Sequence, residues 1–282
     1  ISGRSMRRYS LIKRFTTRML LQIRKFCMQS KIDRERIISM GAIPKRVVIT
    51  GNTKYDQTYA EVSEEERAKL RREFRFEGKG PIIVAGSTHG GEEEIVVRTF
   101  GKVLEKYPDA RLLLAVREIT RAASVRFMIK HQGYTVLRRS KMGTDEDDGK
   151  GAQIVILDTI GELGRLYSLA DVVFVGGSFV KVGGHNILEP AAHGKPVLVG
   201  PYMFNFQEIF ELLSQRGVCI MTPDEKSFET TLLDLLGNPE KMKKMGEAAL
   251  EVVHENQGAT ERNIASFEEL VKEYGIKLRE NA

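Results

Sequence analysis

The sequence predicts an α/β protein with a doubly wound parallel sheet, and two observations carry that prediction. Between residues 81 and 221, short apolar runs of strand length alternate with longer amphipathic runs of helix length. Segments rich in glycine and hydroxyl residues follow several of the apolar runs, as expected where a strand leads through a loop into a helix. Strands and helices that alternate at this spacing form a parallel sheet with helices on both faces.

The elements of this region follow one another in a regular order. We expect strands at 81–86, 111–116, 134–138, 153–157, 172–176, 196–199 and 218–221. Helices are expected at 91–106, 119–132, 161–168, 205–215, 225–236, 239–255 and 258–278. In such a sheet ligands bind at the carboxyl ends of the strands, so the loops that follow strands are the candidates for a functional site.

The segment that precedes the first of these strands has a different pattern. Here we expect helices at 6–28 and 31–40, a strand at 46–50 and a polar linker at 53–62. The first helix is amphipathic, because apolar residues recur at helical spacing among Arg and Lys, at Leu11, Phe15, Met19, Leu20 and Ile23. Ser63, with Glu66 three residues later, indicates a capping box at the start of the next helix.

The basic charge of the chain is concentrated in residues 1–50. This segment contains thirteen Lys and Arg against two acids, a net charge of +11, whereas residues 51–282 contain 31 against 36, a net charge of −5. One interpretation is a surface helix that packs on its own domain. The other is attraction to an anionic surface, a membrane or a phosphorylated lipid. A nucleic-acid partner is not expected, because no stacking aromatic side chains lie between the charges.

Length and composition are those of a globular protein. The 282 residues suffice for one large domain or two smaller ones. A content of 41% hydrophobic and 29% charged residues is typical of soluble globular proteins. Cys27 and Cys219 are too few and too far apart for a disulfide framework, which suits a reducing compartment. The sequence contains no apolar run of membrane-spanning length and no signal-peptide pattern. It begins with Ile rather than Met, so we expect a fragment of a longer protein.

The most informative loop follows the expected strand at 172–176. Two glycine pairs, at 176–177 and 183–184, lead into a short helix that begins near Asn186. The open N-terminus of that helix suits a phosphate, and Glu189 in its first turn can reach a sugar hydroxyl. The loop therefore predicts a site for a nucleotide-activated donor. The structural alternative is a capping box in which Asn186 caps the helix and Glu189 lies at N3.

Loops after two other strands hold further candidates. In the loop at 86–91, Ser87 can donate to a ligand oxygen or can simply cap the following helix, whose acids at 92–94 are ordinary partners of the helix dipole. Arg117 follows Val116 at the end of a buried strand. It can neutralise a phosphate or a carboxylate, or it can form a surface ion pair with Glu118.

The loop at 158–163 is the fourth candidate. Gly161 would let the backbone approach a base or ribose closely, while Asp158 or Thr159 can simply cap the helix. The five histidines lack the spacing of a metal site, and no Walker, G-x-S-x-G or G-x-G-x-x-G element occurs between a strand and a helix. We therefore expect no metal ion.

Taken together, these motifs resemble the 3-deoxy-D-manno-octulosonic acid (Kdo) transferases, inverting glycosyltransferases that add Kdo from CMP-Kdo to the lipid A precursor in lipopolysaccharide synthesis. The resemblance covers nearly the whole chain. It rests on Ala85–His89, Thr50–Asp56, Asp158–Leu163, Gly176–Ser178, Gly183–Ala191, Gly200–Pro201, Phe204–Phe206 and Asn256–Arg262. The chain departs from the family at Val116-Arg117-Glu118, where Pro-Arg-His is frequent, and at Lys181-Val182, where Pro-Arg is common.

The resemblance implies a fold of GT-B type, in which two Rossmann-like domains face a cleft and the C-terminal domain holds most of the nucleotide. Residues 1–56 would be the last part of an incomplete N-terminal Rossmann-like domain on the acceptor and membrane side. Residues 57–258 would be the nucleotide-sugar-binding domain, and the helix at 259–282 would cross back to the first domain.

The resemblance also implies site residues. The donor, and CMP in particular, would be bound by Ser87, Val116, Arg117, Ile160, Gly161, Glu162, Gly184, Asn186, Ile187, Leu188 and Glu189, with Glu189 on the ribose. Lys54 would stabilise charge at the transition state. CMP-Kdo is the donor substrate, and neither a metal nor another cofactor is implied.

Activity and location follow from the same resemblance. The family's catalytic glutamate base lies ahead of the residues matched here, so the chain by itself would lack its general base and would not turn over. The enzyme would work on the lipid A precursor at the cytoplasmic face of the bacterial inner membrane, peripherally or through a segment outside this chain. Two alternatives stay open: another GT-B enzyme, such as a UDP-sugar transferase or epimerase, and a nucleotide-binding fragment without turnover.

Overall fold

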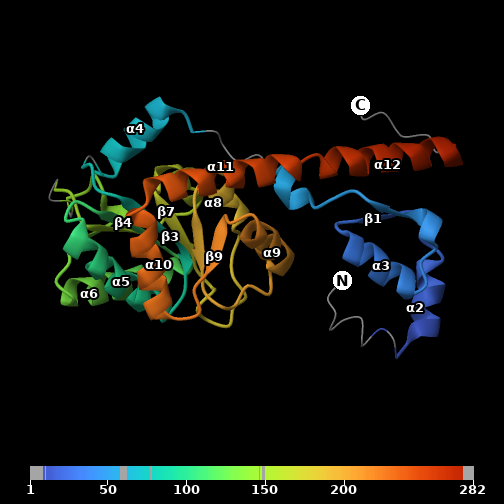
Figure 1. Cartoon of the computed structure of the whole chain (residues 1–282), viewed down its shortest axis with the longest axis horizontal. Helices are drawn as coiled ribbons and strands as arrows, with labels where there is room; N and C mark the ends of the chain where they lie inside the picture. Colours follow the sequence, from blue (N-terminus) through green and yellow to red (C-terminus); the bar gives the residue numbers. More distant parts are fainter. Residues whose placement is uncertain are drawn as a thin grey trace. The chain divides into compact units, whose positions relative to one another are not determined.

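The structure, a computed structural model, describes residues 9, 11–57, 62–76, 78–145, 147 and 150–275. The chain divides into two units, shown in Figure 1. The smaller comprises Ile1–Thr58 together with His254–Ala282, and the larger comprises Tyr59–Val253.

The larger unit is built on one parallel sheet, which confirms the predicted fold class. Its strands are β3 (Ile82–Thr88), β4 (Arg111–Val116), β5 (Val136–Arg138), β6 (Ile154–Leu157), β7 (Val172–Val175), β8 (Val197–Val199) and β9 (Cys219–Met221). Their spatial order is β5-β6-β4-β3-β7-β8-β9, and every pair is parallel. Each strand thus ends at the same edge of the sheet.

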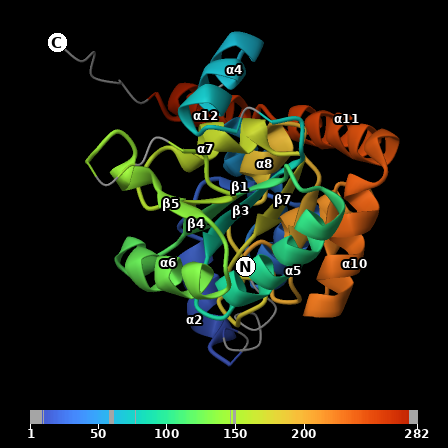
Figure 2. The same ribbon diagram turned by 90° about the vertical axis from the view of Figure 1, so that its left-hand side faces the viewer.

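Helices cover both faces of this sheet, as Figure 2 shows with α5, α6 and α10 on one side and α7 and α8 on the other. The bounds are α4 (Glu64–Glu73), α5 (Glu92–Lys106), α6 (Ala122–His131), α7 (Leu163–Leu166), α8 (Leu188–Ala192), α9 (Gln207–Gln215), α10 (Glu225–Leu236) and α11 (Pro239–Glu255). Short 3₁₀ turns complete the set at η3 (Ile119–Arg121), η4 (Arg139–Lys141) and η5 (Tyr167–Leu169). The single helix predicted at 161–168 is therefore two short pieces, α7 and η5.

The core lies between the sheet and the helices α5, α6 and α10. The central strands are apolar on both faces because helices cover both, and they contribute fully buried residues such as Leu114, Ile156 and Phe174. The Phe174 ring packs on Phe179 and Phe228, with centroids 5.4 and 5.1 Å away. Since Phe179 belongs to the loop after β7, this cluster ties that loop to the core.

The strand order reverses between β3 and β7. The chain continues from β3 to the neighbouring β4 on one side and from β7 to β8 on the other, while Ala85 of β3 pairs with Phe174 of β7. Such a switch point is where open parallel sheets bind ligands, in the crevice outside the carboxyl ends of the strands. The loops after β6, β4, β3 and β7 follow four adjacent strands here.

The smaller unit contains α2 (Lys13–Leu20), β1 (Phe26–Met28), α3 (Lys31–Ser39), η1 (Pro44–Arg46), β2 (Val47–Ile49), η2 (Thr53–Asp56) and α12 (Ala259–Tyr274). Strands β1 and β2 pair in parallel.

The prediction of one helix over 6–28 is wrong within the described part of that range. The Arg46 guanidinium donates to the carbonyl oxygens of Leu21 and Ile23, at 2.9 and 3.0 Å. These carbonyls are thereby satisfied without a further helical turn, and the chain continues into β1. Residues 6–8 and 10 lie outside the described residues.

Two segments two hundred residues apart meet in the smaller unit. The Asp56 carboxylate accepts from the backbone N–H groups of Gly258, Ala259 and Thr260 at the start of α12. Arg262 donates from Nε to the Thr50 carbonyl at 2.7 Å. Burial opposes ionisation of Asp56, but the bonds from α12 outweigh it and lower its pKa, as expected for an acid at a helix N-terminus.

Among the described residues, no helix is both long enough and apolar enough to cross a bilayer.

Candidate functional site

Glu92, the first residue of α5, joins the loops that follow β3 and β7. Its side chain is 0% exposed, and both carboxylate oxygens accept from backbone N–H groups. Oε1 accepts from Ser178 and Phe179 at 2.9 and 2.8 Å, and Oε2 from Gly177 and His89 at 2.7 and 2.9 Å. The sequence predicts an ordinary partner of the helix dipole here; the fold gives this acid a further role, because it lies between two loops that are far apart in the sequence.

The same two loops approach each other at backbone distance. A Cβ on Gly176 would lie 2.5 Å from the Ser87 carbonyl oxygen and 2.7 Å from Thr88 Cα, so only glycine fits there. Ser87 itself has φ +55°, a conformation rare for non-glycine residues, at a break in the register between β3 and β4. Such strain concentrates at functional sites.

A pair of histidines also connects these loops. His89, after β3, and His185, after β7, place their Nε2 atoms 2.8 Å apart with ring planes inclined by 1°. One ring donates and the other accepts, so one proton lies between the two Nε2 atoms. Burial, together with the charges of His89 and Arg117, lowers the pKa of His185 to about 4.

Arg117 supplies the fixed positive charge of the site. Its backbone N–H donates to the Thr88 carbonyl at 2.9 Å, and its exposed side chain lies close enough to His185 to influence the pKa of that residue. Val116, the last residue of β4, is buried. Of these two predicted residues, only Arg117 therefore presents a side chain to solvent.

The loop after β7 ends in the five-residue helix α8. Asn186 Oδ1 accepts from the Leu188 N–H, and its amide nitrogen donates to Glu189 Oε1, both at 3.1 Å. The predicted capping box is not formed, because α8 begins at Leu188 and Asn186 reaches Glu189 with its side chain instead of its backbone. Gly184 has φ +77°, and a Cβ on it would lie 2.3 Å from Met203 Sδ, while Ile187 and Leu188 are fully buried. Ile187 and Leu188 can therefore offer a ligand only backbone groups.

Glu189 is half-buried beside α7. Burial raises its pKa, and the hydrogen bond from Asn186 opposes that rise. A Cβ on Gly164 would lie 3.9 Å from Glu189 Oε2, and the charge of Glu189 contributes to a raised pKa of buried Tyr167. The carboxylate thus lies between the loop after β7 and the loop after β6.

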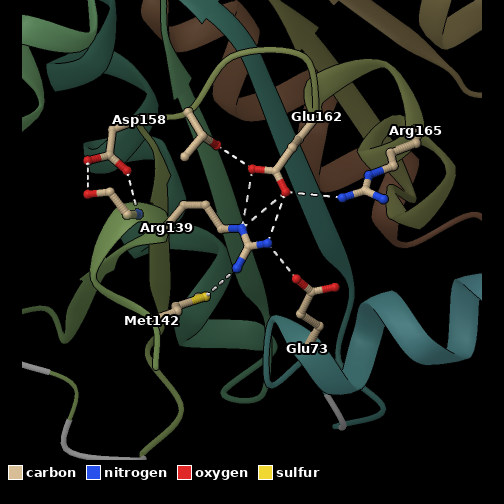
Figure 3. A network of polar contacts seen from close by, with 8 residues as sticks. Glu73, Arg139, Met142, Asp158, Glu162 and Arg165 are labelled. Carbon is tan, nitrogen blue, oxygen red and sulfur yellow. Dashed lines mark hydrogen bonds and ion pairs between the residues drawn. The ribbon is translucent and has the colours of Figure 1, made fainter. Parts of the chain in front are cut away.

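The turn after β6 is open on one side and anchored on the other. Ile160 is 85% exposed, and Gly161 has φ +89° with open space where a side chain would be. Figure 3 shows the anchored side: Glu162 binds Arg139 at 2.9 Å, Arg165 at 3.1 Å and the Thr159 hydroxyl.

The network of Figure 3 extends from Glu162 through Arg139 to Glu73 of α4. Burial of Glu162 disfavours its charge, but the hydrogen bonds from Arg139 and Thr159 outweigh burial and lower its pKa. In the same region, Asp158 accepts from Arg138 and Ser140. Because Glu162 already has these partners, it holds the turn in place and leaves Ile160 and Gly161 as the accessible part.

The remaining predicted residue, Lys54, lies in the smaller unit. It is half-buried in η2, and its backbone N–H donates to Asn52 Oδ1 at 3.0 Å. Within the parts of the chain that the structure describes, no three His, Cys, Asp or Glu side chains are grouped to hold a metal ion. The expectation of a metal-free reaction stays a prediction.

Three residues of this arrangement were outside the sequence-based set: His89, His185 and Glu92. A signal did exist, since each loop carries a histidine next to a glycine. The loops are nearly a hundred residues apart, however, and only the pairing of β3 with β7 brings them together.

The chain is similar to Kdo transferases along most of its length. Residues 1–57 match the family model described as 3-deoxy-D-manno-octulosonic-acid transferase, and residues 144–252 match that of glycosyl transferases group 1. A 3-deoxy-D-manno-octulosonic acid transferase of Haemophilus influenzae is 36% identical over 93% of this chain and 60% of its own length. One from Bordetella pertussis is 29% identical over 95% and 61%. The chain thus spans about 60% of the length of these relatives.

Solved structures agree with this likeness. The C-terminal CMP-Kdo binding domain of WaaA from Acinetobacter baumannii is 27% identical, with a TM-score of 0.60, over 67% of this chain and 96% of that domain. The Staphylococcus aureus MnaA–UDP structure has a TM-score of 0.62 at 15% identity, over 93% of this chain and 65% of that one, and shows the fold alone. By these matches, the chain is similar to the 3-deoxy-D-manno-octulosonic acid transferase family over nearly all of its length.

Proposed function

We propose that the larger unit binds CMP-Kdo and that the whole protein transfers Kdo from it to the lipid A precursor. The observation that carries this proposal is the convergence of four loops at the switch point of the sheet, within a unit that is similar to a CMP-Kdo binding domain over nearly that domain's full length. The loops supply groups suited to the three parts of such a donor: phosphate, ribose and base.

The phosphate is assigned to the loops after β4, β3 and β7. Arg117 offers a permanent positive charge, and the His89–His185 pair offers one ring N–H that can turn to a ligand oxygen. Ser87 adds a hydroxyl donor beside them. The start of α8 adds the partial positive charge of a helix N-terminus, which favours an anion.

The ribose and the base are assigned to Glu189 and to the turn after β6. A half-buried carboxylate can accept from two neighbouring sugar hydroxyls, and Asn186 orients it through the hydrogen bond to Oε1. Ile160 and Gly161 offer an exposed apolar side chain and an unobstructed backbone on which a flat base can rest.

The chemistry proposed is an inverting transfer. An acceptor hydroxyl oxygen forms a bond to the anomeric carbon of Kdo while the bond from that carbon to the phosphate oxygen breaks. CMP leaves with the electron pair, and a carboxylate base outside this chain takes the hydroxyl proton. Arg117 would stabilise the departing phosphate, and Lys54 would stabilise charge in the transition state. Since these cations supply the positive charge, we propose that no metal is needed.

A membrane surface is the proposed location, and α2 supports it. Phe15 and Met19 are 61% and 55% exposed on α2, which also carries Lys13, Arg14 and Arg18, and Leu11, just before the helix, is 86% exposed. Among the described residues of the smaller unit, α2 is docked through buried Thr16, through the Thr17 hydroxyl, which donates to the Met40 carbonyl at 3.0 Å, and through Leu20. The interpretation of a helix docked on its own unit therefore has support, and Phe15 and Met19 are the apolar residues of α2 that stay exposed. An exposed helix with apolar and basic residues is suited to an anionic lipid surface. We place it at the cytoplasmic face of the inner membrane, where the free thiols Cys27 and Cys219 suit the reducing side.

The first prediction concerns the ribose contact. Glu189→Gln should weaken CMP binding by about 10- to 100-fold, because hydrogen bonds to a charged acceptor are worth about 1.5–3 kcal/mol. Isothermal titration of the full chain measures this. Glu208→Gln, a matched change in the first turn of α9, should bind as the unchanged chain does. The proposed donor requires that the chain bind CMP, with its cytosine base, more tightly than UMP. Tighter binding of UMP would favour a UDP-sugar enzyme.

The second prediction concerns pH. His185 resists protonation until about pH 4 in the folded chain, whereas a histidine in the unfolded chain titrates near 6.5. The unfolded state therefore binds more protons between these values, and the free energy of unfolding falls as the pH falls through this window. Urea denaturation at several pH values should give a steeper fall for the unchanged chain than for His185→Asn. The exposed His131→Asn is the control, and equal slopes for His185→Asn and the unchanged chain would refute the assignment.

The third prediction concerns Lys54. Lys54→Ala should keep the CMP affinity but lower transfer by about 100-fold, the usual cost of removing one group that stabilises developing charge. Transfer is measured with this chain joined to the N-terminal part of the Haemophilus influenzae relative. The exposed Lys45→Ala is the control. Activity of the 282-residue chain alone would contradict the proposal that the base lies outside it. Loss of the joined protein's activity on treatment with EDTA would contradict the proposed metal independence.

The fourth prediction concerns the membrane. The chain should bind vesicles that contain phosphatidylglycerol more tightly than vesicles of phosphatidylcholine alone, and high salt should abolish the difference. Phe15→Ser with Met19→Ser should lower binding, and Arg14→Gln should lower it about fivefold, since each cation near an anionic surface contributes about 1 kcal/mol. Phe267→Ser, an equally exposed residue of α12, is the control. Equal sedimentation of all variants with anionic vesicles would exclude α2 as the contact.

A further inference from the structure

We propose that Glu92 is a positioning residue of the donor site: an internal anion that fixes the loops after β3 and β7 as one rigid frame before the donor binds. The proposal rests on the proposed function, since it concerns the same site. It assigns a task to a residue that touches neither the phosphate nor the sugar.

The loop after β7 has the form of an anion site that is already filled. Three consecutive backbone N–H groups, from Gly177 to Phe179, converge on one point, as successive amides do in loops that bind phosphate. That point is occupied by the carboxylate of Glu92 from the neighbouring element. The N–H groups of this glycine loop are therefore not available to a ligand, and the donor phosphate must be bound by the groups around it.

Glu92 also determines where those surrounding groups lie. Its fourth bond is to the His89 N–H, so the same carboxylate fixes the backbone of His89 and the backbone that leads to His185. The two histidine rings meet at 2.8 Å across the gap that Glu92 closes. A shift of either loop would separate the rings and move the groups assigned to the phosphate.

The chemistry of the contact explains why a carboxylate is needed. Four N–H donors of the described residues face the two oxygens, the set that an ionised carboxylate satisfies. A carboxamide has one accepting oxygen, and its NH₂ group would face two of the four donors. Because Glu92 is fully buried, water cannot replace the lost acceptor, so the affected N–H groups would be left unpaired.

Glu93 provides a matched comparison on the next residue of α5. It is equally buried, but its carboxylate binds the Arg121 side chain at 2.8 Å rather than the loops. Glu93→Gln therefore perturbs a buried carboxylate of the same helix turn without touching the loops.

The test measures amide hydrogen exchange and CMP binding in the full chain. In Glu92→Gln we expect the amides of His89, Gly177, Ser178 and Phe179 to exchange at least about tenfold faster, and the CMP affinity to fall about tenfold. In Glu93→Gln we expect a lowered melting temperature but unchanged exchange at these four amides and unchanged CMP affinity. Equal exchange at the four amides in both variants would overturn the proposal.

A measurement on the unchanged chain decides the matter even if Glu92→Gln does not fold. The four amides should be protected as strongly as those of β3 and β7 without any ligand, and CMP should add little. Protection that arises only on adding CMP would mean that the donor, and not Glu92, orders the loops. If the chain binds no CMP at all, the proposed function fails, whereas protection without ligand still supports the rigid frame.

Discussion

The buried carboxylate of Glu92 connects the fold of the larger unit with its site. It is placed by the first turn of α5, which follows β3, and it is satisfied by backbone groups that follow β7. The contact exists only because β3 and β7 are neighbours at the point where the strand order reverses. Around it lie the close approach at Gly176, the strained Ser87 and the histidine pair. Each of these depends on the relative position of the two loops.

Carboxylates play three different parts around this switch point, and their partners distinguish them. Glu92 is bound by backbone N–H groups alone, and Glu162 by two arginines and a hydroxyl. In both of these carboxylates the oxygens already accept hydrogen bonds from within the protein. Glu189 is bound by one amide nitrogen, and burial raises its pKa. Only Glu189 keeps capacity to accept from a ligand, and for this reason we assign it to the sugar.

The smaller unit is held together by the same kind of contact. Asp56 accepts from the first N–H groups of α12, and Arg262 donates to the Thr50 carbonyl, so the start of α12 is fixed on the segment that contains Lys54. The sequence motifs at 50–56 and 256–262 therefore contact each other and hold the smaller unit together. Their likeness to the family reflects this contact as much as any chemistry at Lys54.

The sequence by itself determined the order and the type of the elements in the larger unit, because apolar runs of strand and helix length report burial directly. It also indicated the likeness to Kdo transferases, through short motifs most of which follow strands. The tertiary structure alone decided which loops meet. It replaced the capping box at Asn186 by a side-chain contact to Glu189, and it placed Glu92 and the two histidines in the site. It also ended the basic helix at Leu20 and formed β1, through contacts from Arg46. For Glu92, the histidines and the end of the basic helix the physical reason is the same: each depends on a partner that is far away in the sequence, and periodicity reports burial but not the identity of the neighbour. The contact from Asn186 to Glu189 is local, and there the sequence identified both residues but not which of their groups meet.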